Sequence, residues 1–161
     1  MQIAVTDSTR WTRVWLAGLI PIAHVGGTTD HVRSAFGRFV AEALFWTPAA
    51  VLPSPQVSWE AVSKDVARVT MRKGALEQSV DVTVAEDGRP TEVVFPRWSN
   101  VNADQTYRLQ PFGGVMSDFQ SFDGFRVPTS VEAGNHFGTD DYFPFFKATV
   151  TDLRFATPKT R

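Results

Sequence analysis

The segment Thr29–Trp46 has the pattern of a long amphipathic helix, and the chain after it has the pattern of strands and turns. Its apolar side chains recur at spacings of three and four residues, which places them along one helix face. This apolar face consists of Val32, Ala35, Phe36, Phe39, Val40 and Ala43. Any fold of this chain must therefore bury one long helix against strands.

The residues at the two ends of this segment predict where the helix begins and ends. Thr28, Thr29 and Asp30 offer side-chain oxygens to the free backbone N–H groups of a first turn. Pro48 disfavours the helical conformation in the residue before it, so the helix is expected to end near Trp46.

The remaining helix positions predict how it meets the sheet. Polar side chains fall mostly opposite the apolar face, and Arg38 and Glu42 are spaced to form an ion pair. Gly37 weakens a helix by roughly 1 kcal/mol relative to alanine. We expect it to mark a close approach of the helix to the sheet.

Short segments with strand patterns follow one another after the helix, separated by turns such as Lys73-Gly74 and Phe122-Asp123-Gly124. Before the helix, residues 11–25 favour one bent strand, with a bulge at Gly18. The later segments are 57–62, 66–72, 79–85, 91–97, 107–119, 125–133 and 145–155. The pattern predicts an α+β fold, in which a strongly curved antiparallel sheet wraps around one main helix.

Length, charge and cysteine content narrow the class of protein. A chain of 161 residues is expected to form a single domain, 1–161. Sixteen basic and seventeen acidic residues nearly balance, which argues against nucleic acid as a partner. The chain contains no cysteine, and no apolar stretch approaches the ~20 residues of a membrane helix. We therefore expect a cytoplasmic protein without a transmembrane segment.

Three stretches of the chain resemble an uncharacterised bacterial family, catalogued as domain of unknown function 6544 and later 6920. They are RFVAEALFWTPAAVLPSPQVSWEAV, FGGVMSDFQSFDGFRVPTSVEAG and FGTDDYFPFFKATVTDLRF. The resemblance implies the half-barrel architecture of lipoprotein carriers, in which a curved sheet encloses an apolar cavity around a helix. Family members are usually longer at the N-terminus, so part of the expected sheet is missing, shortened or supplied by a second chain.

The aromatic composition, together with this fold analogy, predicts a binding function. Thirteen Phe and five Trp accompany only two Tyr, so the aromatic surface is almost entirely apolar. It either fills a large core or lines a pocket for a lipophilic, fatty-acyl-like small molecule. The predicted pocket residues are Phe36, Phe39, Ala43, Trp46, Trp59, Arg97, Trp98, Tyr142 and Phe143.

Arg97 and Trp98 lie beside Tyr107 and Arg108 at the predicted rim of the sheet. An arginine next to an aromatic ring can hold a carboxylate or carbonyl while the ring contacts an acyl chain. The alternative is a salt bridge at the rim to Asp104 or Asp118.

The loop GNHFGTDDYFPFF supports a second hypothesis, a small hydrolase of hydrophobic esters or acyl lactones. His136, Asp140 and Asp141 are candidate catalytic residues, and the two carboxylates are candidate ligands for Ca²⁺. The alternative is an ordinary loop, in which Asp140 caps a turn and Asp141 is solvated. His24 and His31 would join His136 in a metal or acid–base site only if the last hairpin covers the helix N-terminus.

A third hypothesis is structural. An unpaired sheet edge can join two copies of the chain into a homodimer. No G-x-S-x-G nucleophile motif and no complete phosphate-binding loop is present in the sequence.

Overall fold

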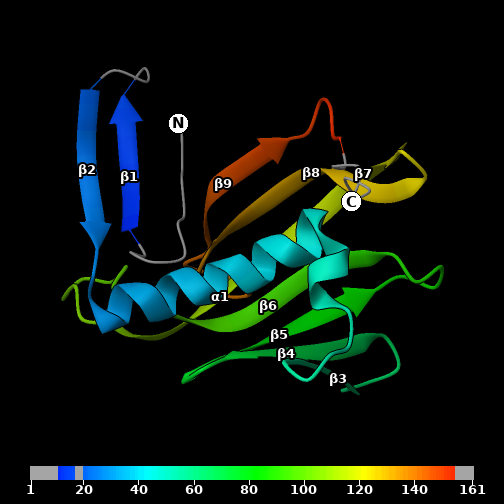
Figure 1. Ribbon diagram of the computed structural model, residues 1–161, viewed down its shortest axis with the longest axis horizontal. Coiled ribbons are helices and arrows are strands. Elements are labelled where there is room, and N and C mark those ends of the chain that lie inside the picture. The colour runs from blue at the N-terminus through cyan, green and yellow to red at the C-terminus, as the bar shows by residue number, and fades with distance from the viewer. Residues whose placement is uncertain (1–10, 17–19, 155–161) are drawn as a thin grey trace, which may run out of the picture.

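The structure is a computed structural model that describes the backbone of residues 11–16 and 20–26, and all atoms of residues 27–154. One helix and a seven-stranded antiparallel sheet form most of the fold (Figure 1). The elements in chain order are β1 (Trp11–Leu16), β2 (Ile20–Gly26), α1 (Thr29–Trp46), the 3₁₀ helix η1 (Pro48–Val51), β3 (Val57–Ala61), β4 (Val66–Lys73), β5 (Leu76–Val84), β6 (Pro90–Ser99), β7 (Arg108–Phe122), β8 (Phe125–Asn135) and β9 (Phe143–Thr149).

Helix α1 has the predicted bounds. The Thr28 hydroxyl accepts a hydrogen bond of 3.1 Å from the backbone N–H of His31, so Thr28 is the N-cap. The helix ends at Trp46, and Pro48 begins η1 directly afterwards. The predicted ion pair between Arg38 and Glu42 is present, with 3.2 Å between Nε and Oε1.

Strands β3 to β9 pair in sequence order, each antiparallel to the next, and the sheet is not closed. The predicted α+β class with an antiparallel sheet is confirmed. The last strand differs from the prediction: β9 begins at Phe143 and ends at Thr149, whereas residues 145–155 were expected. The described chain contains no helix with both the length and the apolar composition that a membrane span requires.

The prediction of one bent strand over residues 11–25 is wrong. This segment forms two antiparallel strands, β1 and β2, in a small sheet of their own. The register shifts between Val14 and Trp15, whereas the bulge predicted at Gly18 lies outside the described residues. The apolar residues of the two strands give no period that separates one long strand from two short ones.

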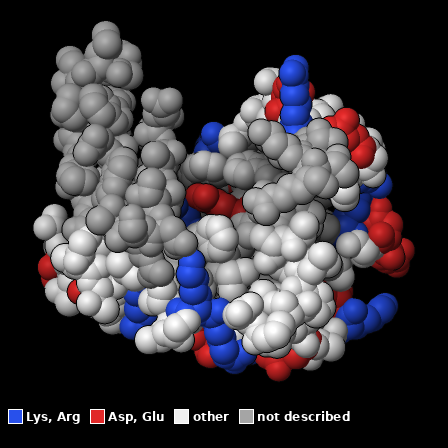
Figure 2. Space-filling model, in the orientation of Figure 1, with Lys and Arg blue, Asp and Glu red and all other residues white. Residues whose placement is uncertain are grey.

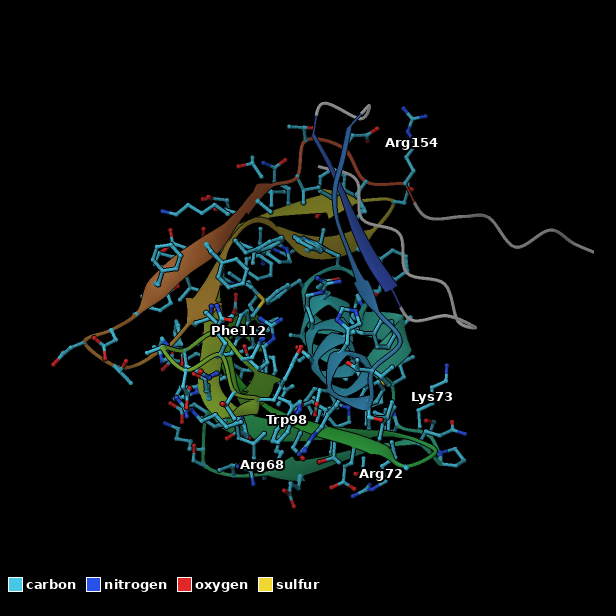
Figure 3. All side chains as sticks on the ribbon, turned by 90° about the vertical axis from the view of Figure 1, so that its left-hand side faces the viewer. Arg68, Arg72, Lys73, Trp98, Phe112 and Arg154 are labelled. Atoms are coloured by element: carbon cyan, nitrogen blue, oxygen red, sulfur yellow. The ribbon has the colours of Figure 1, made fainter. Side chains whose placement is uncertain are left out.

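The core lies between α1 and the face of the sheet that packs against it. Val40 of the helix and Val69, Val80 and Val93 of three successive strands are completely buried. Gly37 makes the predicted close approach, because a Cβ atom there would lie 2.8 Å from Gln78 Oε1 and 3.3 Å from Phe95 Cε2. Figure 3 shows Phe112 on the side of the sheet toward α1, and Arg68 and Arg72 on the other side.

The buried face of the helix is rotated about the helix axis relative to the predicted apolar face. Phe36, Val40 and Ala43 are buried as expected, but the Phe39 side chain is 50% exposed. Ala41, Leu44 and Phe45 are buried instead. Spacing alone gives a stripe, and the packing of the sheet around the helix decides which edge of the stripe is covered.

Candidate functional site

Strand β6 places an arginine on the face of the sheet that packs against the helix. Val93 and Phe95 of β6 belong to the core, and side chains two residues apart on a strand share a face. Arg97 is the next position on that face. Its cross-strand partner is Gln110 of β7, and Phe95 pairs with Phe112 in the same way.

The Arg97 guanidinium is shielded from solvent and incompletely hydrogen-bonded. Its Nη2 donates to the Ser34 hydroxyl of α1 over 3.5 Å. Its Nε is buried and has no hydrogen-bond partner among residues 27–154. The guanidinium carbon lies 5.0 Å from the centre of the Phe112 ring, over its face. An arginine held this way retains donors for an added acceptor.

The charges near Arg97 are mixed. Burial, and to a lesser extent the nearby Arg38 cation, lowers the pKa of Arg97 to about 10, although Glu42 and Tyr107 oppose the change. With this pKa, Arg97 is still protonated at neutral pH. The Glu42 carboxylate is already bound to Arg38. Ser34 of the helix therefore contacts Arg97, and Arg38 and Glu42 lie near it. This differs from the prediction that the polar helix side chains lie mostly opposite the buried face.

Aromatic rings continue this surface across the sheet. The Phe112 ring lies 5.3 Å from Phe95 and 6.0 Å from Phe145 of β9. A β-bulge beside Ala133 places an extra residue in β9 and turns Phe145 toward Phe112. Phe146 packs instead against Trp46 at the end of the helix, with 6.2 Å between ring centres. Phe145 remains 51% exposed.

Trp98 fastens the helix N-terminus to the sheet. Its indole N–H donates to the Asp30 carboxylate over 2.8 Å, and the Arg33 guanidinium carbon lies 4.1 Å from the ring centre. Tyr107 stacks on it at 6.3 Å. The salt bridge predicted as an alternative exists for Arg108, which binds Asp104 over 3.1 Å, and Arg97 takes no part in it.

The other predicted pocket residues are dispersed over the helix and the sheet. The Trp46 indole donates to the carbonyl of Pro128, and the Trp59 indole donates to the carbonyl of Val51 over 2.7 Å at the opposite edge of the sheet. Phe36 and Ala43 are core residues. Phe143 is 63% exposed at the start of β9, where it pairs with Asn135, the cross-strand neighbour of Phe112. Phe143 therefore lies near Phe112, whereas Trp59 lies at the far edge of the sheet.

The loop after β8 is held by hydrogen bonds to β7 and within its own turn. His136 has a positive φ of 57°, and its N–H donates to the carbonyl of Pro111 over 2.7 Å. The Thr139 hydroxyl accepts from the N–H of Asp141 over 3.3 Å, so Thr139 performs the turn-capping role that was expected of Asp140. Both carboxylates are exposed.

Two aromatic residues of this loop lie on the outer face of the sheet. A Cβ atom on Gly113 would lie 2.6 Å from the Phe137 ring, and Gly113 faces away from the helix because it alternates with Phe112. Tyr142 packs on Phe137, with 5.1 Å between ring centres, and its hydroxyl is buried without a hydrogen-bond partner in the described part of the chain. Burial and the nearby Glu132 raise the pKa of Tyr142. Tyr142 therefore lies on the opposite side of the sheet from Arg97.

The three histidines do not form a described cluster. His31 lies in the first turn of α1, where burial and Arg38 lower its pKa, and His136 lies beyond the end of β8. The side chain of His24 is outside the described residues. Among the residues that are described, no three His, Asp or Glu side chains gather as a metal site would require.

Sequence reasoning identified Arg97 and missed the residues around it. The residues that were not predicted are Ser34, Phe112, Asn135 and Phe145. Asn135 is buried and pairs directly with Phe112 across the strands. The signal that was available is the alternation Val-x-Phe-x-Arg in β6, which places a cation on a core face.

A family model described as "Family of unknown function (DUF6544)" matches residues 4–148 of the chain. No curated protein and no solved structure gives a significant match. The matched range includes α1, strands β1 to β8 and most of β9, which confirms the resemblance drawn from the three sequence stretches. The chain therefore belongs to this family of unknown function, DUF6544.

Proposed function

We propose that this protein binds a lipophilic, fatty-acyl-like small molecule between helix α1 and strands β6 to β9. The observation that carries the proposal is the exposure of Phe145. This ring contacts Phe112 on the side of the sheet toward the helix, yet it is 51% exposed. A large apolar side chain on an inner face is normally covered. A ligand chain that packs on Phe145 would cover it.

The opposite wall of the proposed site is polar. Helix α1 turns Ser34 toward Arg97, and Arg38 and Glu42 lie close enough to shift the pKa of Arg97. Figure 2 shows acidic and basic side chains close together in the middle of this face of the molecule. Such a combination of aromatic and charged walls fits an amphipathic ligand better than a purely apolar one.

The course of the strands supports the proposal. In Figure 3 they pass below the helix and rise beside it toward β9. Strands β3 and β9 stay apart as the two ends of an open sheet. We propose that this arrangement acts as a half-barrel, in which one part of the sheet packs on the helix and the other part faces the ligand.

Calorimetric titration with a matched pair of probes tests the proposal. Dodecanoate and dodecanol have the same chain length and differ in their head groups. We expect saturable binding of at least one of them, and Phe145→Ala is expected to weaken it about tenfold because it removes one apolar wall.

The control variant is Phe125→Ala. Phe125 has a similar exposure, 55%, but lies at the β7–β8 turn, at the other end of these strands. Binding should be unchanged in this variant. The proposal is wrong if neither probe binds, or if the two variants weaken binding equally.

A further inference from the structure

Arg97 is a cation on the core side of the sheet without a matching anion among the described side chains. Strand alternation places it in line with Val93 and Phe95, both of which are buried. The side chain therefore leaves water when the chain folds, which costs free energy unless its hydrogen bonds are replaced. The bond of 3.5 Å to Ser34 replaces one of them, and the buried Nε has none.

The neighbouring side chains do not neutralise Arg97. No ion pair joins it to a carboxylate among residues 27–154. Glu42 is the acidic group near enough to favour its charge, but Glu42 is bound to Arg38 over 3.2 Å. Two cations and one carboxylate, Arg97, Arg38 and Glu42, leave a single net positive charge around Arg97.

We propose that Arg97 binds the carboxylate of a fatty-acid-like ligand, with Phe112 and Phe145 contacting the first carbons of its chain. This inference rests on the proposed function and names the head group of the ligand. A guanidinium presents parallel N–H donors that match the two oxygens of a carboxylate. The Nε without a partner is one such donor, and the rings beside it supply the apolar contact.

The local charge favours a monoanion over a phosphate. A phosphate monoester carries close to two negative charges at neutral pH, and Glu42 would repel the second charge. A neutral alcohol or ester would leave the buried cation uncompensated. A carboxylate balances the single net positive charge of Arg97, Arg38 and Glu42.

The test compares dodecanoate with dodecanol in calorimetric titrations at neutral pH. We expect the native protein to bind dodecanoate at least tenfold more tightly than dodecanol. In Arg97→Gln the affinity for dodecanoate should fall to that of dodecanol, while the affinity for dodecanol stays within about twofold. Arg97→Lys should retain part of the preference, because it keeps the charge without the planar donor pair.

Arg72→Gln is the matched control. Arg72 lies on β4, pairs with Glu77 and points away from the helix, so its removal should leave both affinities unchanged. Far-ultraviolet circular dichroism and a melting curve verify that each variant is folded.

Equal binding of both probes by the native protein overturns the carboxylate assignment and leaves the lipophilic site standing. The same conclusion follows if Arg97→Gln keeps the preference for dodecanoate. If neither probe binds, both proposals are wrong.

Discussion

The two ends of helix α1 meet the sheet in different ways. At the C-terminal end, Leu44 and Phe45 are buried in the apolar core, and Trp46 packs against Phe146. At the N-terminal end the contacts are polar: Asp30 accepts from the Trp98 indole and Ser34 accepts from Arg97. One helix therefore joins a solid core to a region of charged groups and partly exposed rings.

This difference separates stability from binding. Burial of apolar area is the main favourable contribution to folding, and the C-terminal end supplies it. The N-terminal end keeps a desolvated cation, which opposes folding. A costly group of this kind is expected where a ligand uses it. The comparison predicts that substitutions at the two ends change the free energy of unfolding in opposite directions.

The largest effect is expected at the packed end. Phe45 is 3% exposed, so Phe45→Ala leaves a cavity in the core and should reduce the free energy of unfolding by about 3–5 kcal/mol. Urea denaturation followed by circular dichroism measures this change. The control is Phe39→Ala on the same helix, where the side chain is 50% exposed and the expected loss is below about 1 kcal/mol. Similar losses in both variants would contradict the rotated helix face.

The next effect has the opposite sign. Arg97→Met removes the buried charge and keeps a long apolar side chain, so it should raise the free energy of unfolding by about 1–2 kcal/mol. The same urea titration measures it. If Arg97→Met lowers the free energy of unfolding by more than about 1 kcal/mol, Arg97 stabilises the fold, and the view that it is kept for ligand binding at a cost in stability is wrong.

The lowered pKa of Arg97 makes the difference in unfolding free energy between Arg97→Met and the native protein depend on pH. In the unfolded chain Arg97 keeps the usual, higher pKa of an arginine, whereas in the folded protein its pKa is lowered to about 10. Above that pH the unfolded state holds more protons, so the penalty of the buried charge decreases as the pH rises. The advantage of Arg97→Met should be constant up to about pH 9 and then shrink. An advantage that grows with pH would contradict this assignment.

The fold was largely predictable because its signals are local. The period of three to four residues, Thr28 before the helix and Pro48 after it determine α1, and alternation in residues 79–84 determines one face of β5. The β1–β2 hairpin was missed because apolar residues run through both strands without a clear period.

The site was only partly predictable because it depends on register. Arg97 is placed by alternation within one strand. Phe145 reaches Phe112 only through the bulge beside Ala133, and the bulge arises from the pairing of β8 with β9. The loop of Asp140 and Asp141 drew attention by composition, but composition does not tell on which side of the sheet a loop packs.

The smallest effect tests the charge argument around Arg97. Glu42→Gln removes the carboxylate that competes for Arg38, so calorimetry should show dodecanoate binding two- to threefold more tightly, with dodecanol unaffected. Loss of the i, i+4 pair should cost about 0.3–0.5 kcal/mol of stability. Glu77→Gln, which removes the partner of Arg72 on the outer face, should leave both affinities unchanged. Weaker binding of dodecanoate in Glu42→Gln would mean that Glu42 orients the cations, so that the site works through the geometry of the Arg38–Glu42 pair and not through net charge.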